Sequence, residues 1–473
     1  KKSSVVVVSM LIRIRMDKGE ATIDESHAHL LKRMKEESIK TIGISFGSPY
    51  LPSYESLDAY MCAYGYGSVS LRAAANALWG RSSIQGKLPI TLNDKYKIGH
   101  GIEIKTRKFS FKDSSKEYNL ESAWGVIDEA ISSNVFPGAQ IMVVQDDEIV
   151  AEKSFGKFSY DESSSDVSNS SIYDIASITK VLSVTPVTMK LINRKKISLN
   201  HTLDQYYPSL RGDEKGDITI KHLLTHSSGM KPFIEFYRED STMQKETMIE
   251  NILTLDLDFY PGERMQYSDL GIIILMDIIE YVSDSTLDDL CQRWIFDPIG
   301  MNSTSYNPSG LIKSNIVPTE EDNYFRNRLL IGEVHDEKAY LLDGVSGHAG
   351  IFSNANDLAK YAQLFLNGGT WLGNRIFPDN QIEDFTARQN IPKGSDRAIG
   401  WDTPSRNGTS SAGDYFSDHS YGHLGFTGTS LWVDHSRKVI VVLLTNRVHP
   451  SRESKGMYSV RRAFHTEIMK AIL

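Results

Sequence analysis

Residues 139–155 read Ala-Gln-Ile-Met-Val-Val-Gln-Asp-Asp-Glu-Ile-Val-Ala-Glu-Lys-Ser-Phe and contain two apolar runs on either side of Asp146-Asp147. Short runs rich in β-branched residues that flank a polar turn are typical of two paired strands. This stretch therefore predicts a β-hairpin, and the surrounding sequence indicates what the hairpin pairs with.

Segments from both ends of the same region complete this hairpin into a predicted sheet. Apolar residues at positions 120, 124, 127 and 131 form one helical face just before it. Near the C-terminus we predict strands at 429–433 and 439–444 and a helix at about 453–472. The long segment between these predicted strands shows mostly helical periodicity. We therefore expect an α/β sandwich with an inserted helical subdomain and a cleft between its layers.

The first 92 residues have a different pattern, in which strands and helices alternate. The predicted elements follow one another in the order 4–12, 25–38, 41–46, 59–64 and 71–78. This βαβα order predicts a parallel sheet covered by helices. A polar segment at 106–119 predicts a linker. We expect a partial α/β domain at 1–105 and a second domain at 120–473.

Composition excludes several classes of protein. The 473 residues include 52 Lys and Arg against 60 Asp and Glu, and the basic residues are scattered, which disfavours a nucleic-acid binder. Cys62 and Cys291 cannot form a disulfide framework or a four-thiolate zinc site. The Val5–Val8 run is too short to span a bilayer and is soon followed by Arg13 and Arg15, so we interpret it as a strand.

The sharpest chemical signal is Ser177-Ile178-Thr179-Lys180 at the predicted start of a helix. Residues i and i+3 share a helix face, so the Lys180 amine can reach the Ser177 hydroxyl. A lysine that is partly removed from water can accept the proton of a nucleophilic serine. The alternative is an N-cap serine beside a solvated lysine, because Ser-x-x-Lys often arises by chance.

Two later segments favour the catalytic interpretation. Tyr267-Ser268-Asp269 enters an apolar helix that begins near residue 270, and Gly422-His-Leu-Gly-Phe-Thr-Gly428 leads into a strand. Together with Ser177-x-x-Lys180, these segments resemble the serine β-lactamase and penicillin-binding-protein superfamily, on its class C β-lactamase and esterase side. Further similar segments follow in the expected order across 120–473: 223–229 (LLTHSSG), 298–301 (PIGM) and 346–353 (SGHAGIFS).

The resemblance implies a role for each matching residue. Ser177 is the expected acyl-enzyme nucleophile, Lys180 the general base or proton relay, and Tyr267 the relay to the leaving group. The backbone amides of Ser177 and Phe426 are the expected oxyanion hole. Such an arrangement splits acyl transfer into two steps and stabilises the tetrahedral oxygen.

Departures from the family pattern fall at the expected substrate-binding positions, which are Asp269, His423, Leu424 and Gly425. Asp269 stands where the family often has Asn, and a carboxylate beside Lys180 raises the lysine pKa. His423 stands where the family pattern has a lysine, so the fixed cation is missing. Leu424 stands where the family pattern has a hydroxyl residue that helps to hold the carboxylate of a β-lactam. We therefore expect an ester, amide or peptide substrate and weak or absent β-lactam turnover.

The spacing of the histidines does not predict a metal site. His222 and His226 stand four residues apart and could share a helix face, but the Glu of an H-E-x-x-H zinc site is missing. We interpret His226 as organising its loop. For His348 we favour a structural role over one in lining the cleft. We expect no metal and no organic cofactor.

Residues 1–105 resemble the end of the C-terminal domain of glycoside hydrolase family 3, particularly bacterial β-N-acetylhexosaminidases. The similar segments are 46–50 (FGSPY), 73–75 (AAA) with Trp79-Gly80, and 86–91 (GKLPIT). The catalytic residues of that family lie on a preceding barrel, so we expect no glycosidase chemistry here. Because the chain begins at Lys1 in a strand, we expect the full-length protein to continue upstream as a fusion of the two families.

The sequence thus predicts a serine hydrolase that acts through an acyl-enzyme in cell-wall metabolism. Its expected substrate is a small molecule or a peptidoglycan fragment, with no nucleic-acid partner and no transmembrane segment. The resemblance implies the bacterial envelope, in the periplasm. Two alternatives remain, a carboxylesterase and a catalytically silent peptidoglycan-binding module.

Overall fold

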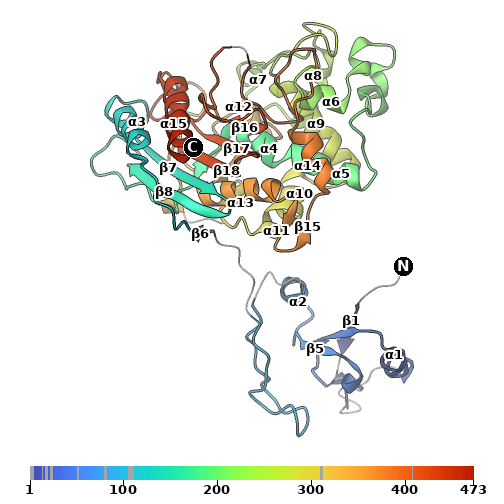
Figure 1. Cartoon of the computed structure of the whole chain (residues 1–473). Helices are drawn as coiled ribbons and strands as arrows, with labels where there is room; N and C mark the ends of the chain where they lie inside the picture. Colours follow the sequence, from blue (N-terminus) through green and yellow to red (C-terminus); the bar gives the residue numbers. More distant parts are fainter. Residues whose placement is uncertain are drawn as a thin grey trace. The chain divides into compact units, whose positions relative to one another are not determined.

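The computed structural model divides into two compact units, residues 1–109 and 110–473 (Figure 1). Each unit is described by itself. The structure describes residues 5–12, 14–15, 20–21, 25–50, 53–78, 83–104, 111–308, 313–406 and 408–473. Trp79, Gly80, Arg13 and the first part of the predicted linker lie outside these residues.

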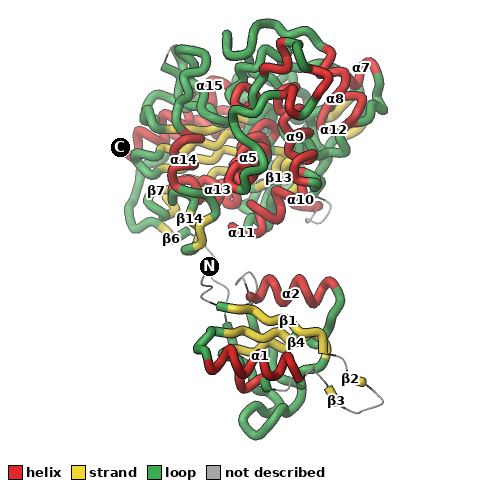
Figure 2. Tube along the Cα trace, turned by 90° about the vertical axis from the view of Figure 1, so that its right-hand side faces the viewer, coloured by secondary structure: helices red, strands yellow, loops and turns green. Residues whose placement is uncertain are grey.

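The smaller unit is built on a three-stranded parallel sheet in the order β1-β4-β5, as predicted from its alternating pattern. Helices α1 and α2 cover opposite faces of this sheet (Figure 2). Leu31 of α1 packs with Ile12, whereas Ala74 of α2 packs with Ile44 and Phe46. The elements are β1 Val6–Ile12, β2 Ile14–Arg15, β3 Glu20–Ala21, α1 Glu25–Glu36, β4 Thr41–Gly47, β5 Ala59–Cys62 and α2 Ser68–Leu78.

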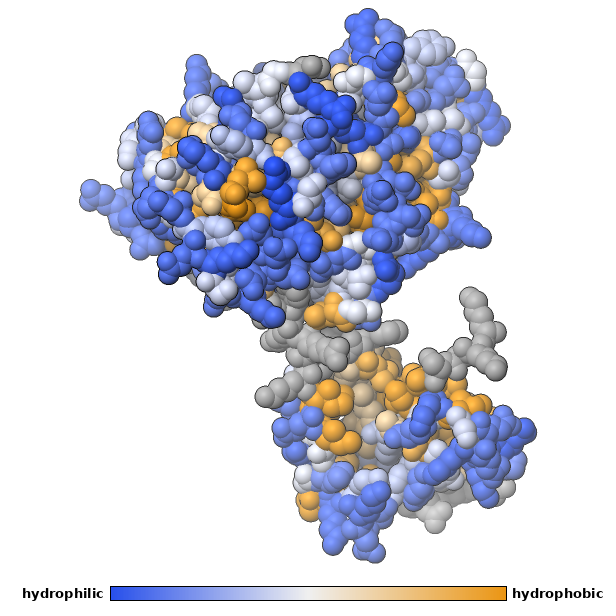
Figure 3. All heavy atoms as spheres, viewed as in Figure 1, coloured by the Kyte–Doolittle hydropathy of each residue, from blue (hydrophilic) through white to orange (hydrophobic). Residues whose placement is uncertain are grey.

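Several apolar side chains of the smaller unit are exposed among the described residues. Val7 and Leu11, which alternate with half-buried residues along β1, are about half exposed, and Val69 of α2 is 81% exposed. Apolar side chains of the smaller unit are visible in Figure 3.

The larger unit contains a six-stranded sheet in the order β16-β17-β18-β7-β8-β6. The predicted hairpin is confirmed as β7–β8, and β18 from the C-terminal end pairs antiparallel with β7. The segment predicted as a linker contributes β6, which pairs with β8. The strands are β6 Lys112–Asp113, β7 Gly138–Gln145, β8 Glu148–Gly156, β16 Ser420–Leu424, β17 Ser430–Asp434 and β18 Val439–Thr445.

Both faces of the central strands are covered, which explains their unbroken apolar sequence. Ile141 and Val143 of β7 pack with α3 (Glu121–Ser132) and α15 (Met457–Ile472) in one core cluster. Helix α13 (Ala355–Leu366) contacts β7 and β18 as well.

The predicted helical subdomain occupies the centre of the chain. Helix α9 is largely buried, since its residues from 270 to 276 are all buried. The helices are α4 Thr179–Leu182, α5 Val184–Asn193, α6 Ile220–Leu224, α7 Phe236–Glu239, α8 Lys245–Thr254, α9 Asp269–Ser283, α10 Leu287–Cys291, α11 Asp297–Ile299, α12 Glu337–Leu341 and α14 Asp379–Thr386.

Short strand pairs connect these helices to the sheet. The segment before α4 forms β9, which joins β13 and β10 in a small antiparallel sheet. The short strands are β9 Tyr173–Asp174, β10 Ser305–Tyr306, β11 Glu321–Asp322, β12 Arg328–Leu329, β13 Ile351–Ser353, β14 Thr370–Trp371 and β15 Asn374–Arg375. Among the described residues, no helix is both long and apolar enough to cross a membrane.

Candidate active site

Ser177 and Lys180 lie where β9 leads through a short 3-10 turn into α4. Lys180 Nζ donates a hydrogen bond to Ser177 Oγ at 2.8 Å and another to the His348 carbonyl oxygen at 3.1 Å. The Lys180 side chain is only 1% exposed, whereas Ser177 is half-buried. The predicted i, i+3 contact is therefore present, with a buried lysine and a more accessible serine.

Asp269 begins α9 and points at the same lysine. Its Oδ1 atom lies 2.9 Å from Lys180 Nζ. The preceding residue, Ser268, fixes this helix end because its Oγ accepts a hydrogen bond from the Gly271 amide at 3.1 Å. Burial lowers the pKa of Lys180, but the charge of Asp269 and the contact with Tyr267 outweigh it, and the lysine pKa rises. The resting lysine is thus protonated.

A second lysine neutralises Asp269 from the other side. Lys338 Nζ lies 3.7 Å from Asp269 Oδ2 and 3.1 Å from Asp336 Oδ2. His348 Nε2 in turn lies 2.8 Å from Asp336 Oδ1, within hydrogen-bond distance, so this histidine adjoins the same group of side chains. Asp269, Asp336 and His348 are close enough together for metal binding, but ammonium groups already pair with both carboxylates. The arrangement is that of a charge network.

Tyr267 lies between Lys180 and two buried imidazoles. Lys180 Nζ is 4.8 Å from the centre of the Tyr267 ring, and the ring centres of His226 and His423 are 4.3 and 6.1 Å away. His226 Nδ1 accepts a hydrogen bond from the Ser268 amide at 3.2 Å. His226 therefore packs against Tyr267 and holds the backbone next to it, in agreement with the predicted loop-organising role.

His222 and His226 do not share a helix face, which removes the possibility that their spacing raised. Helix α6 ends at Leu224, and His226 follows it with a left-handed φ of 54°. His222 instead takes part in the cap of α6, where its Nδ1 accepts a hydrogen bond from the Thr219 amide at 3.2 Å. The two imidazoles thus serve separate local contacts.

The third motif, residues 422–428, contains the end of a strand and a turn. The sequence predicted only that it precedes a strand. His423 and Leu424 lie on β16, and the following residues form the turn to β17. Thr427 Oγ1 donates to the Asp174 carbonyl oxygen at 2.7 Å, and Thr429 Oγ1 donates to the Ile175 carbonyl oxygen at 3.1 Å. The turn is therefore held against the backbone that leads into Ser177.

Two backbone amides that the sequence predicted to form an oxyanion hole have no hydrogen-bond partner among the described residues. The backbone amides of Ser177 and Phe426 donate no hydrogen bond to another described residue. Gly425 allows the close approach, because a Cβ atom there would overlap the Ile175 carbonyl oxygen and Thr429 Oγ1. Two amides thus remain open for a ligand oxygen.

His423 carries no fixed charge. Burial and the nearby cations Lys180 and Arg397 hold its pKa well below the usual range. Its Nδ1 lies 2.8 Å from the Leu424 carbonyl oxygen, which can only accept a hydrogen bond. The imidazole is therefore neutral, with its proton on Nδ1.

Sequence reasoning missed a cation beside this histidine. The guanidinium carbon of Arg397 lies 5.3 Å from the Tyr267 ring centre, and its side chain is only 12% exposed. The site therefore contains a cation. The replacement of the family's lysine by His423 had suggested that this part of the site lacks one. The residues around Arg397 form no recognisable motif, and only its place before the apolar pair Ala398-Ile399 hinted at partial burial.

Comparison with known proteins identifies the family. A sequence profile described as Beta-lactamase matches residues 125–464. The chain belongs to the beta-lactamase family. The chain is 30% identical over 388 residues to an N-acetylmuramyl-L-alanine amidase of Bacillus subtilis. The matched region covers 74% of this chain and 84% of that protein. A Salmonella typhimurium protein with the provisional name D-alanyl-D-alanine carboxypeptidase is 32% identical, covering 71% and 84%.

Solved structures show that the beta-lactamase fold is shared. A class C beta lactamase from Rhodobacter sphaeroides superposes with a TM-score of 0.56 at 18% identity, covering 75% of this chain and all of that one. The hydrolase EstCE1, which has promiscuous acyltransferase activity, gives 0.58 at 19% identity, covering 73% and 98%. A penicillin-binding protein homologue from Pyrococcus abyssi gives 0.55 at 22% identity, covering 72% and 76%.

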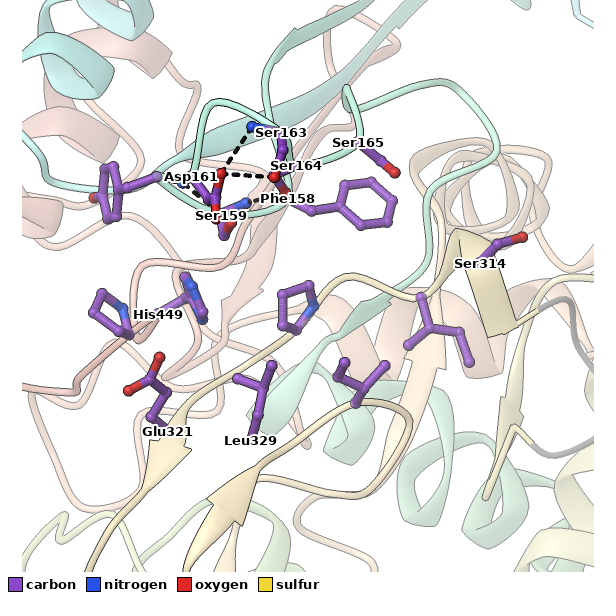
Figure 4. A pocket seen from close by; sticks show the side chains of 15 residues that line it. Phe158, Ser159, Asp161, Ser163, Ser164, Ser165, Ser314, Glu321, Leu329 and His449 are labelled. Atoms are coloured by element: carbon purple, nitrogen blue, oxygen red, sulfur yellow. Dashed lines mark hydrogen bonds between the residues drawn. The ribbon is translucent and has the colours of Figure 1, made fainter.

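A separate pocket of about 640 Å³ lies elsewhere on this unit (Figure 4). Its 15 lining residues fall within 158–165, 314–331 and 449–450 and include none of the predicted catalytic residues. Asp161 accepts hydrogen bonds from the amide and hydroxyl of Ser163, both at 2.8 Å. The polar groups of this loop therefore largely satisfy one another.

Proposed function

We propose that this protein hydrolyses an amide bond in a peptidoglycan-derived peptide through an acyl-Ser177 intermediate. The hydrogen bond of 2.8 Å between Ser177 Oγ and buried Lys180 Nζ carries the proposal, because it joins a nucleophile to a base. The amidase and carboxypeptidase names of the curated relatives support an amide substrate from the cell wall.

In the proposed acylation, Ser177 Oγ attacks the substrate carbonyl carbon and gives its proton to the deprotonated form of Lys180. The Ser177 and Phe426 amides stabilise the oxyanion. As the amide bond breaks, Tyr267 relays the proton taken up by Lys180 to the leaving nitrogen, so that the lysine and the tyrosine both return to their starting forms. A water molecule later hydrolyses the ester. Since Asp269 keeps the resting lysine protonated, the rate rises with pH until Lys180 loses its proton.

Hydrolysis of p-nitrophenyl acetate, together with mass spectrometry after fluorophosphonate treatment, tests this assignment. We expect turnover and a single adduct on Ser177, both lost in Ser177→Ala. Ser241→Ala changes an exposed serine and is the matched control. Equal rates for the wild type and Ser177→Ala would overturn the proposal and favour a silent binding module. We expect little or no hydrolysis of penicillin.

A carboxylesterase is the second candidate, and one observation favours it. The raised pKa of Lys180 weakens the resting base, and an ester needs less help from proton transfer than an amide because an alkoxide leaves more easily than an amine anion. Ser177-dependent cleavage of esters, without cleavage of any acyl-peptide, would select this candidate.

We also propose that residues 1–105 belong to a glycoside hydrolase family 3 C-terminal domain and that the protein works in the bacterial envelope. The parallel order β1-β4-β5 with a helix on each face supports the first part. The cell-wall names of the relatives support the second. Detection of the native protein in a periplasmic fraction tests the location.

A further inference from the structure

The peptide group between Gly425 and Phe426 is held from the side opposite to its open amide. The N–H of this peptide belongs to Phe426 and donates no hydrogen bond to another described residue. Its carbonyl oxygen belongs to Gly425 and accepts a hydrogen bond from Nη2 of Arg461 on α15. The peptide is trans, so its carbonyl and its N–H point in opposite directions. The bond to Arg461 therefore fixes the direction of the Phe426 N–H.

Arg461 is a buried cation whose contacts are with backbone oxygens. The residue is only 9% exposed, and its Nη2 atom also donates to the Thr429 carbonyl oxygen at 2.8 Å. Its Nε atom has no hydrogen-bond partner among the described residues. Burial and the nearby charge of Arg447 lower the pKa of Arg461, so its charge is poorly compensated. Such a burial costs stability, and the benefit of this arginine is therefore to be sought in the site.

Arg447 holds the peptide group on the other side of Phe426. Its Nε atom donates to the Phe426 carbonyl oxygen at 2.7 Å, and its guanidinium carbon lies 4.3 Å from the Phe426 ring centre. The two carbonyl groups that flank the Phe426 N–H thus both face guanidinium groups. A charge-assisted hydrogen bond to a carbonyl polarises its peptide and makes the N–H of that peptide a stronger donor.

The turn has further hydrogen bonds that do not need Arg461. The Gly428 amide donates to the Gly425 carbonyl oxygen at 3.1 Å, and the Gly425 amide donates to the Thr429 carbonyl oxygen at 2.8 Å. Both carbonyl oxygens therefore keep a partner when the guanidinium is removed. We expect the loss of Arg461 to weaken the polarisation and orientation of the peptide without unfolding the turn.

We propose that Arg461 is a positioning residue of the oxyanion hole. Its guanidinium holds the Gly425 carbonyl, directs the Phe426 N–H towards the reacting carbonyl and strengthens that N–H as a donor. The negative charge of the oxyanion develops only in the transition state, so Arg461 acts on the acylation step and not on substrate binding. The inference rests on the proposed function, because it requires acylation of Ser177 with the Phe426 amide as an oxyanion donor.

Single-turnover acylation by p-nitrophenyl acetate tests this role, because stopped-flow traces give the acylation rate constant and the substrate Kd separately. We expect Arg461→Met to lower the rate constant by about 10- to 100-fold and to leave the Kd within about twofold. Arg461→Lys retains a cation and should restore part of the rate. Arg462→Met is the matched control, because this neighbouring arginine is 41% exposed and pairs with Asp414 instead. It should acylate at the wild-type rate.

Inhibition by phenylboronic acid gives a readout that a general loss of folded protein would not change. Its boron atom bonds to Ser177 Oγ as the hydroxyl proton is lost, which gives a tetrahedral anion with one oxygen in the oxyanion hole. We expect the inhibition constant of Arg461→Met to rise by about the same factor as its acylation rate falls. Titration of active sites with a fluorophosphonate, together with thermal melting, gives the folded fraction of each variant.

A wild-type rate constant in Arg461→Met would overturn the inference, as would a slower rate with unchanged affinity for phenylboronic acid. If Arg461→Met does not fold, Arg461→Gln takes its place, since it keeps a neutral donor. We then expect a loss of at least about threefold in both measurements, and no loss would overturn the inference. Ser177-dependent acylation that is unaffected by Arg461 leaves the proposed function standing. A wild-type protein without Ser177-dependent turnover contradicts both.

Discussion

Asp269 Oδ1 lies 2.9 Å from Lys180 Nζ and reverses the effect of burial on that lysine. A lysine that is 1% exposed loses proton affinity through desolvation, yet the carboxylate more than restores it. The candidate base is therefore present in its protonated form at rest. This relationship makes the pH dependence of acylation a direct readout of the site.

Asp269→Asn should move the acid limb of the acylation rate to lower pH. The amide removes the charge that raises the pKa of Lys180, so burial then dominates and the lysine deprotonates more easily. Stopped-flow acylation by p-nitrophenyl acetate, measured from pH 5 to 11.5 and corrected for uncatalysed hydrolysis, reports this limb, because the wild-type lysine pKa lies above its ordinary value of 10.5. Asp256→Asn changes an exposed aspartate and should leave the profile in place. An unmoved limb in Asp269→Asn would contradict the role of the carboxylate.

Lys338→Met should move the same limb in the opposite direction. Lys338 Nζ lies 3.7 Å from Asp269 Oδ2, and without it the negative charges of Asp269 and Asp336 raise the pKa of Lys180 further. We expect slower acylation at pH 7 and recovery at higher pH. Lys338→Arg retains the charge and should keep the limb near its wild-type position. A shift to lower pH in Lys338→Met would show that Lys338 does not act through Asp269.

Gly425→Ala should slow acylation at least tenfold. Its Cβ atom would overlap the Ile175 carbonyl oxygen, so the turn that carries the Phe426 amide must move away from the backbone before Ser177. Gly125→Ala on α3 is the control, because a Cβ there meets nothing within 4 Å and alanine favours the helix by about 1 kcal/mol. Fluorophosphonate labelling rates measure both. Equal labelling of the two variants would argue against Phe426 as an oxyanion donor.

The sequence was most informative where periodicity and local spacing determine the structure. The runs on either side of Asp146-Asp147 predicted the β7–β8 hairpin, and the i, i+3 spacing predicted the contact between Ser177 and Lys180. Helix α9 was also predicted near its true start at Asp269. These features depend on interactions within a few residues, which a single sequence contains.

Contacts between distant segments could not be predicted in the same way. Lys338 and Asp269 are 69 positions apart, and Lys338 in its charged run, Asp336-Glu337-Lys338, is typical of a solvated surface. Arg397 meets Tyr267 only because the fold brings them together. The β16 strand was missed because Gly422 and His423 are not typical strand residues.

Glu320 should make the larger unit sensitive to acid. Burial raises the pKa of its carboxyl, but hydrogen bonds from His335 and Arg452 lower it from 4.5 to about 2. A depressed folded-state pKa stabilises the fold above the unfolded-state pKa, and this stability is lost as pH falls from about 4.5 towards 2. The shift corresponds to roughly 3 kcal/mol at neutral pH.

Glu320→Gln should therefore lower the free energy of unfolding by about that amount at pH 7 and by much less near pH 2. The side chain is 3% exposed, so little of the effect is screened by solvent. Urea unfolding of the larger unit, followed by tryptophan fluorescence at several pH values, measures the difference. Glu321→Gln changes the exposed neighbour and should behave as the wild type. A constant difference between Glu320→Gln and the wild type from pH 7 to 2 would show that the carboxylate does not supply the acid sensitivity.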